Sequence, residues 1–392
     1  MKTRRTVWAI FVLIAFGMAA SGDNLPPIKW KGTIATENGI KVVRNPADPF
    51  YGTFIFDLEE DLAIGGDPTK EESYFPKGMT GLAVDDEGNI FVSDFGNTRV
   101  QMYDRTGKFI RTFGRKGQGP GEFQSPGKLL LDPSGNLCVF DILKIHIFEK
   151  SGRFSRQVAL KSSLNFPFIS ISGAVFGMEF ASHESGGFME SLKKIEPDAS
   201  VPQVIDRFRG EFKEGQILYV VHVYTSRASL APIDVSSFCY GFSSDYRIRF
   251  ADSSGQTVLI AEKDENPTKI TGPEKDWIRK KNPLLAWGSG DMLDPRKRMI
   301  FPDHRPYFER LLSDNLGRIY ALKIKPVLDP DSPYTADVFS RNGYALYRLT
   351  MPVKPFLIKA GYVYEVRRDP ETDEQLIVRH RIRNWKEFKT GS

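Results

Sequence analysis

The sequence of 392 residues contains little of the chemistry that usually marks an enzyme. It has two cysteines and five histidines, and the histidines lie far apart, at His146, His183, His222, His304 and His380. No Gly-x-Ser-x-Gly segment is present, so hydrolase chemistry that uses this nucleophile motif has no support. Because protein metal sites need clustered His, Cys, Asp or Glu side chains, the sequence predicts no catalytic residue and no metal ligand.

An excess of charge of one sign is also missing. The formal net charge is +5, but Lys2, Arg4 and Arg5 belong to an N-terminal segment that we expect to be removed, which leaves about +2. Nucleic-acid-binding domains usually carry a strongly basic surface, so nucleic acid is not an expected partner. Basic residues do gather in the range 379–386, but acidic residues surround them, and we interpret this range as a solvated strand pair and tail.

Long hydrophobic runs are absent except at the N-terminus. After the positive start, residues 8–16 are apolar without interruption, and small residues follow at 19–22. This is the layout of a cleavable secretory signal, because the run is only about half of the roughly 20 residues that a membrane-spanning helix needs. We therefore expect residues 1–22 to be a signal peptide and the mature protein to be periplasmic or secreted, with no membrane span.

A repeated pattern is the clearest positive feature. Residues 84–94, Val-Asp-Asp-Glu-Gly-Asn-Ile-Phe-Val-Ser-Asp, recur about 47 residues later as 131–141, Leu-Asp-Pro-Ser-Gly-Asn-Leu-Cys-Val-Phe-Asp, and a third copy covers 314–321. A second pattern of aromatic, polar and glycine residues follows each copy, at 103–109, 148–154 and 339–344. This spacing is in the range of propeller blades.

The pattern has a physical reason. An acidic or small polar residue, two variable residues and a glycine suit a tight turn, because the first side chain caps the turn and glycine accepts positive φ. Period-2 alternation on both sides indicates strands. We assign structural turn or repeat roles to Asp85, Gly88, Asp94, Asp104, Gly107, Asp132, Gly135, Asp141, Gly152, Asp314, Gly317 and Gly343.

Two such turns in each repeat join four strands, which is one propeller blade. Counting along the chain predicts an all-β, six-bladed β-propeller of four-stranded antiparallel blades over residues 51–392, preceded by a lead-in at 23–50. We place the blades at residues 78–114, 125–160, 166–208, 216–262, 307–351 and from 354 onward. The last blade lacks an outer strand, and residues 53–65 are predicted to supply it and to close the ring.

One stretch, residues 267–305, fits no blade. Within it, residues 273–281 are predicted to form a short helix with proline in its first turn and cations at its end. We expect this insertion to cover one face of the ring, either as a packing cap or as a functional loop. The best candidates for ligand contact are His304, Arg305 and Tyr307, together with His222 in a predicted inner strand.

The repeats of this chain resemble those of a known group of proteins. The segments 88–94, 97–101, 104–107 and 113–123 are similar to an NHL repeat and to the glycine-rich loop that often follows one. The chain is thus similar to exported bacterial six-bladed propellers with NHL-like repeats, which largely lack an assigned activity. Some relatives in this group are zinc lyases with histidines at the central channel, and propeller lactonases hold calcium. Of the histidines here, only His222 and His304 could face the channel.

We therefore predict no cofactor, although the resemblance leaves calcium and zinc open. Cys138 and Cys239 fall in blades that are not neighbours, which favours two buried free thiols over a disulfide. The leading hypothesis is a monomeric, non-catalytic module outside the cytoplasm that presents a propeller face to a protein, peptide or glycan. The alternative is an enzyme at the channel mouth, a metal-dependent lyase or hydrolase.

Overall fold

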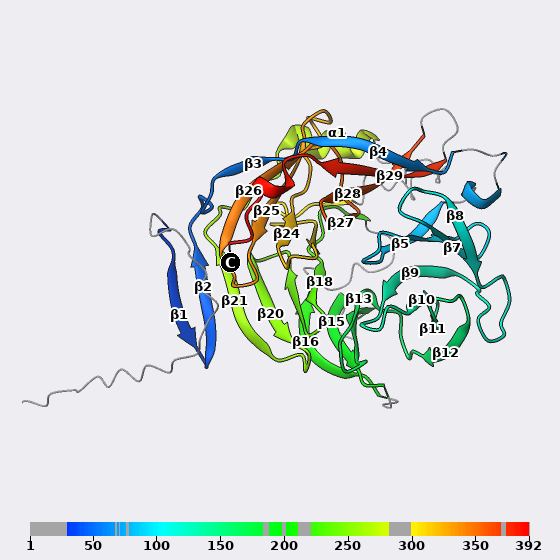
Figure 1. Cartoon of the computed structure of the whole chain (residues 1–392). Helices are drawn as coiled ribbons and strands as arrows, with labels where there is room; N and C mark the ends of the chain where they lie inside the picture. Colours follow the sequence, from blue (N-terminus) through cyan, green and yellow to red (C-terminus); the bar gives the residue numbers. More distant parts are fainter. Residues whose placement is uncertain are drawn as a thin grey trace, which may run out of the picture.

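The computed structural model describes residues 30–66, 69, 71–75, 78–182, 188–197, 201–210, 221–281, 299–369 and 374–391. Six antiparallel sheets stand around a ring (Figure 1). Their inner strands, β5, β9, β13, β18, β23 and β27, contact one another in this order, and β27 contacts β5 again. The prediction of an all-β, six-bladed propeller is therefore confirmed. The predicted signal peptide lies outside the described residues.

The first three blades follow the repeat closely. Blade 1 contains β5 (Met79–Val84), β6 (Ile90–Asp94), β7 (Arg99–Tyr103) and β8 (Phe109–Phe113). Blade 2 contains β9 (Pro126–Leu131), β10 (Leu137–Asp141), β11 (Lys144–Phe148) and β12 (Phe154–Ala159). Blade 3 contains β13 (Asn165–Ile169), β14 (Val175–Ser182), β15 (Phe188–Ile195) and β16 (Gln203–Arg209).

The other three blades complete the ring. Blade 4 contains β18 (Ala228–Asp234), β19 (Ser237–Phe242), β20 (Arg247–Asp252) and β21 (Thr257–Lys263). Blade 5 contains β23 (Arg310–Ser313), β24 (Ile319–Leu322), β25 (Tyr334–Phe339) and β26 (Ala345–Met351). Blade 6 contains β27 (Leu357–Lys359), β28 (Tyr362–Arg368), β29 (Gln375–Ile382) and, from the N-terminal part, β4 (Leu58–Ile64).

The Asp-x-x-Gly turns have the expected conformation. In the first turn of blade 2, the Asp132 carboxylate accepts hydrogen bonds from the backbone N–H of Ser134 and Asn136, at 2.9 and 2.8 Å. Gly135 has a φ of 77°, which a residue with a side chain rarely adopts. The same turn recurs with positive φ at Gly88, Gly107, Gly152, Gly317 and Gly343.

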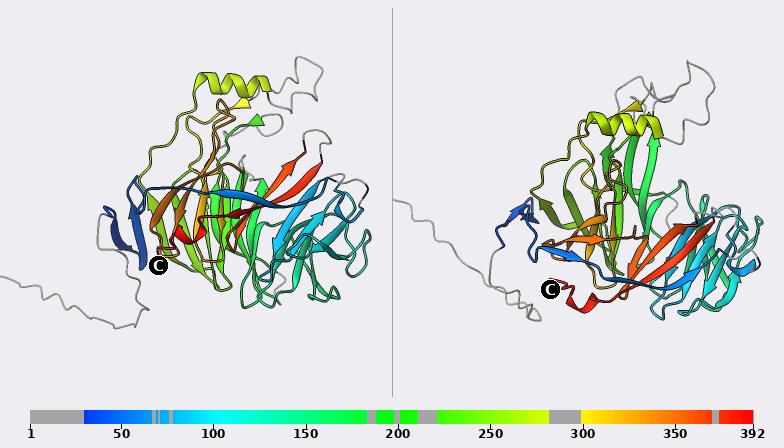
Figure 2. Two further views of the ribbon diagram at one scale, coloured as in Figure 1. Left: turned by 45° about the horizontal axis from the view of Figure 1, so that its top comes forward. Right: turned by 90° about the horizontal axis from the view of Figure 1, so that it is seen from above.

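These turns also define two faces of the ring. Turns after the first and third strands of each blade lie at one edge of the sheets, which we call the turn face, because consecutive strands are antiparallel. The connections between blades lie at the opposite edge, which we call the insertion face. It carries the helix α1 (Gly272–Lys281) and the short strands β17 (Val221–His222) and β22 (Met299–Ile300), which pair with each other (Figure 2).

The ring closes as predicted. Strand β4 pairs antiparallel with β29 as the outer strand of blade 6. The Asp61 carboxylate accepts two hydrogen bonds from the Arg379 guanidinium, at 2.9 and 3.1 Å. Arg379 and His380 are buried, and His380 contacts Glu365 at 3.1 Å. The interpretation of this basic stretch as solvated is therefore wrong at these two residues, because closure of the ring covers them.

The N-terminal lead-in contains two strands that the sequence analysis did not predict. Strands β1 (Thr33–Glu37) and β2 (Ile40–Asn45) form a hairpin, and β2 pairs in parallel with β21 of blade 4. Val42 and Val43 are fully buried, which gives β2 an apolar face to pack. Strand β3 (Thr53–Ile55) adds to β26 of blade 5, so only the later part of the predicted closing strand joins blade 6.

Blade 4 begins at Ala228, later than the predicted residue 216, because the chain first forms β17 outside the blade. Short 3-10 helices cover Glu71–Ser73 and Trp385–Glu387. Within the described part of the chain, no helix is long and apolar enough to cross a membrane.

Candidate functional site

The predicted cluster at 304–307 belongs to a small cap on the insertion face. Residues 268–270 and 303–305 run side by side, since the Ile270 N–H donates to the Asp303 carbonyl and the Arg305 N–H donates to the Thr268 carbonyl, at 3.0 and 2.8 Å. His304 lies in this base, opposite Lys269. Helix α1 follows directly, as predicted from its sequence.

Glu274 attaches the helix to the rest of the cap. Its buried carboxylate accepts hydrogen bonds from the Tyr224 hydroxyl at 2.6 Å and from the Arg305 guanidinium at 2.7 and 2.8 Å. Burial disfavours the charged form, but these donors outweigh it and hold the pKa of Glu274 below its ordinary value. Arg305 is therefore a cap residue whose charge is already neutralised.

The other predicted ligand residues are not collected with Arg305 into one pocket. Tyr307 packs against Tyr246 of blade 4, with ring centroids 5.3 Å apart. His222 lies in β17, paired with Ile300 of β22, so its predicted place in an inner strand is wrong. The inner strand of blade 4 is β18, which begins six residues later.

The outer surface of α1 carries aromatic and cationic side chains. Trp277 is 40% exposed. Lys275 and Arg279 lie over the ring of Phe301, at 5.8 and 5.2 Å from its centroid, and so join the helix to the segment after β22. Ile278 is buried on the inner side. The cap thus presents an aromatic and basic surface on a helix that a buried ion pair holds in place.

A second charged cluster lies between blades 4 and 5. Asp337 of β25 is buried, and one of its oxygens accepts hydrogen bonds from Lys263 and Lys323, at 3.1 and 3.0 Å, and from the Tyr246 hydroxyl. Glu265 pairs with both lysines, at 2.7 Å to Lys323. Because the charges compensate one another within the cluster, its geometry suits a structural joint between two blades.

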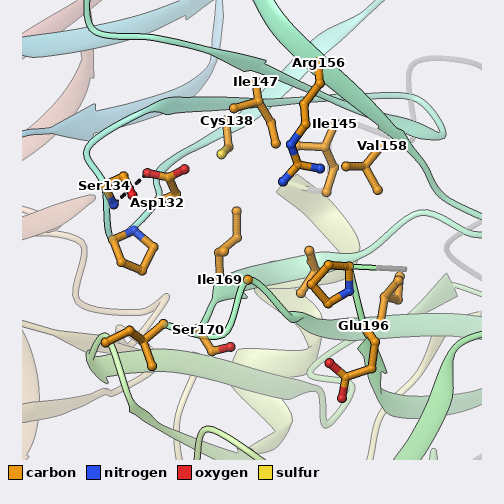
Figure 3. Close-up of a pocket in the computed structure, with 16 residues that line it drawn as sticks. Asp132, Ser134, Cys138, Ile145, Ile147, Arg156, Val158, Ile169, Ser170 and Glu196 are labelled. Atoms are coloured by element: carbon orange, nitrogen blue, oxygen red, sulfur yellow. Dashed lines mark hydrogen bonds between the residues drawn. The ribbon is translucent and has the colours of Figure 1, made fainter. Parts of the chain in front are cut away.

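The turn face has a pocket between blades 2 and 3 (Figure 3). Its volume is about 120 Å³. The walls are mostly aliphatic and come from both blades, and polar groups from the turns lie at the rim. The aliphatic walls include Ile145, Ile147, Val158, Ile169, Val175 and Ile195. Cys138 lies at the wall and is fully buried.

Neither cysteine is a nucleophile in this structure. Both are free and buried, as the sequence predicts. Burial raises the pKa of Cys138 to about 12 and also raises the pKa of Cys239. Since the thiolate is the reactive species, both side chains behave as small apolar residues at neutral pH.

The recurring aspartates have internal partners. Asp94 accepts hydrogen bonds from Asn97 and Arg99, and Asp141 accepts them from two backbone N–H groups at 2.8 and 2.6 Å. Asp314 occupies a different place in its repeat, because it caps the first turn of blade 5 as Asp85 and Asp132 do in their blades. It also pairs with buried Arg318 at 2.6 Å.

A histidine of the repeat region is also buried. The His146 imidazole lies 3.7 Å from the Asp141 carboxylate but makes no hydrogen bond with the described residues, and burial lowers its pKa. Among the side chains that the structure describes, no three His, Cys, Asp or Glu residues lie close enough together to hold a metal ion.

Sequence reasoning missed the residue that organises the cap. Glu274 stands three positions after Thr271, and the two residues exchange hydrogen bonds at 3.4 and 3.5 Å. This is a capping box, whose Thr-x-x-Glu signature is visible in the sequence. The pocket on the turn face has no comparable signal, because its walls come from separate repeats.

Comparisons with known proteins agree with the fold. Residues 77–149 match the model of a family described as a 6-bladed beta-propeller, DUF5128. No curated protein matches the sequence. A candidate exported protein from Bacteroides fragilis has a similar structure, with a TM-score of 0.51, 13% identity, and coverage of 87% of this chain and 99% of that one.

Two further structures are similar at lower identity or over a looser superposition. A member of the DUF4221 family from Bacteroides vulgatus has a TM-score of 0.52 and 12% identity, over 83% of this chain and 97% of that one. Virginiamycin B lyase from Staphylococcus aureus has a TM-score of 0.41 and 11% identity, over 83% and 99%. The likeness to the two Bacteroides structures shows a shared fold alone, and function must be argued from the sites. The NHL-like character of the repeats stays a prediction.

Proposed function

We propose that this protein is an exported, non-catalytic binding module that uses the insertion face of its propeller to hold a protein, peptide or glycan. The observation that carries the proposal is the cap on this face. A helix outside the ring is fixed by a buried ion pair between Glu274 and Arg305, and it keeps Trp277 in contact with solvent. Tryptophan and arginine are the side chains that most often dominate binding interfaces.

The charge of the helix favours an acidic partner. Lys275, Arg279, Lys280 and Lys281 stand against Asp276 and Glu274, and Arg305 already neutralises Glu274. Opposite charge steers association and fixes the register of a complex. A helix that is already held in place also loses less conformational entropy when a partner binds. The expected partner is therefore an acidic protein, peptide or glycan with a surface for Trp277 to stack on.

The test compares partner retention by three immobilised proteins: the wild type, a tryptophan variant and an isoleucine control variant. Wild type, Trp277→Ala and the control Ile110→Ala are each exposed to the exported fraction of the source cells. Ile110 is also 40% exposed, but it lies on the outer strand β8 of blade 1. We expect one component to be retained by wild type and by the control, to be released by added salt, and to be lost with Trp277→Ala. Equal retention by all three proteins would overturn the assignment to this face.

Metal analysis separates the proposal from the alternative, a metal-dependent enzyme at the channel mouth. Purified protein is measured for bound metal before and after treatment with a chelator. The binding-module proposal expects no stoichiometric metal and no change in partner retention. A stoichiometric metal whose removal abolishes retention would contradict it and would favour the enzyme.

A further inference from the structure

The pocket on the turn face is built by strand register. In blade 2, Ile145 pairs with Val158, and Ile147 pairs with Arg156, so these four side chains share one face of the sheet. In blade 3, Val175 pairs with both Ile169 and Ile195. The pocket lies between these two faces, which would otherwise meet as a continuous aliphatic core (Figure 3).

Arg156 is the exception on this face. Figure 3 shows its guanidinium directed into the space beside Ile145 and Val158. The Arg156 guanidinium makes no hydrogen bond or ion pair with any residue that the structure describes. Glu196, at the opposite rim, is paired with Lys194 at 2.5 Å, and its carboxylate points away from the guanidinium.

Blade 1 contains an arginine at the equivalent position, and the comparison shows what is missing in blade 2. Arg111 stands two residues after Phe109 and pairs with Met102, just as Arg156 stands two residues after Phe154 and pairs with Ile147. The guanidinium of Arg111 donates to the Ser151 carbonyl in the third turn of the next blade. Among the described residues Arg156 has no such acceptor, and Arg156 is exposed.

Neither Asp132 nor Cys138 adds a second charged group that is available to a ligand in the pocket. The carboxylate of Asp132 accepts three hydrogen bonds within its own turn, from the Ser134 and Asn136 N–H groups and the Asn136 side chain. The high pKa of Cys138 keeps its thiol neutral. The pocket therefore combines an aliphatic interior with the guanidinium of Arg156. A planar guanidinium prefers a carboxylate, which it can bind through two hydrogen bonds.

Size limits the apolar part of the ligand. A cavity of about 150 Å³ holds benzene, so a pocket of about 120 Å³ has room for roughly four to six carbon atoms. The β-branched isoleucine and valine walls leave a short, broad space that suits a branched chain better than a long straight one. We propose that this pocket is a second binding site, separate from the insertion face, for a short branched aliphatic carboxylate whose carboxylate group is bound by Arg156.

The experiment is a calorimetric titration of the purified protein with 4-methylpentanoate and with its uncharged amide. We expect saturable binding of one acid per chain and binding of the amide that is weaker by about tenfold or more, the usual effect of losing a charged hydrogen-bond partner. N-acetyl-leucine and N-acetyl-leucinamide form a second pair. If N-acetyl-leucine binds more tightly than the free acid, the natural source of the carboxylate is the C-terminus of a peptide.

Variants connect the binding to the pocket. Arg156→Gln is expected to weaken binding of the acid by about tenfold or more and to leave binding of the amide unchanged. The matched control Arg153→Gln removes the same charge from the same strand connection, where Arg153 pairs with Glu149 outside the pocket, and should bind as wild type does. Val158→Phe fills the pocket and should abolish binding of both compounds, with the thermal midpoint measured to confirm that the variant is folded.

Three results would overturn the proposal: no saturable binding to wild type, equal affinity for acid and amide, or unchanged affinity in Arg156→Gln. None of them depends on Trp277 or on the partner of the insertion face. The pocket and the proposed function can therefore fail independently.

Discussion

At the scale of single residues, a buried charge needs partners that compensate it. Asp337 shows this best, because two lysines, a tyrosine and its own strand surround it. Burial disfavours its charged form, but Lys323 and Lys263 outweigh burial, and the pKa of Asp337 lies below its ordinary value of 3.8. None of this was predictable from the sequence, since the participating residues come from separate strands and loops of two blades.

The lowered pKa has a consequence for stability. A carboxyl group whose pKa is lower in the folded state stabilises the fold above its unfolded pKa, and this contribution is lost as the pH falls toward the folded pKa. Asp337→Asn should therefore reduce the free energy of unfolding by about 3–5 kcal/mol at pH 7, because it removes one of the two carboxylates that neutralise Lys263 and Lys323.

Urea unfolding of wild type and Asp337→Asn at pH 7 and at pH 3 measures this effect. The difference between the two proteins should shrink at the lower pH, where the unfolded wild type gains a proton. A difference that stays constant over this range would contradict the role of Asp337 as the charged centre of the cluster.

At the scale of elements, the sequence was informative where turns carry a recognisable signature. Blades 1, 2 and 5 were readable because Asp-x-x-Gly fixes a turn whose glycine has positive φ, as at Gly88 and Gly317. The hairpin of β1 and β2 was missed although its turn, Asn38-Gly39, is a strong hairpin signal. Asn38 and Gly39 have φ values of 51° and 81°, which such a turn requires.

The pocket and the cap also differ in how much of each could be predicted from local sequence signals. The proline in the first turn of α1 and the cations at its end are local signals, so the helix was predicted, whereas the contact of Glu274 with Tyr224 spans fifty residues of sequence. The two walls of the turn-face pocket come from repeats that look alike in sequence. Among the described residues, Arg111 of blade 1 has an acceptor in the next blade, the Ser151 carbonyl, and Arg156 of blade 2 has none.

Nested truncations test how the N-terminal elements contribute. Removing residues up to 39 deletes β1, which pairs only with β2, and should lower the thermal midpoint by a few degrees. Removing residues up to 66 also deletes β4, exposes the edge of β29 and breaks the pair between Asp61 and Arg379.

The longer truncation should abolish the cooperative thermal transition seen by circular dichroism, because an open ring has an unpaired edge and loses the contact between its two ends. An unchanged midpoint after removal of residues up to 66 would show that the ring does not depend on this closure.

At the scale of the whole molecule, packing between blades has to supply the stability without help from a disulfide between the two cysteines. Cys138 and Cys239 are fully buried in clusters of different blades, and both are free. Burial raises the pKa of both thiols, to about 12 for Cys138. Each thiol is therefore protected from reagents as long as its part of the ring stays closed.

Thiol reactivity should then report the opening of the ring. We expect a thiol reagent at pH 8 to modify neither cysteine quickly in the native protein and to modify both in concentrated guanidinium, because only unfolding exposes them. If the ring opens as one cooperative unit, the two thiols should become reactive at the same guanidinium concentration, and a reducing agent should not change the thermal midpoint. Peptide mapping of the modified cysteines at intermediate concentrations makes this measurement. Reaction of Cys138 well before Cys239 would show instead that blades 2 and 3, which enclose the turn-face pocket, separate before the rest of the ring.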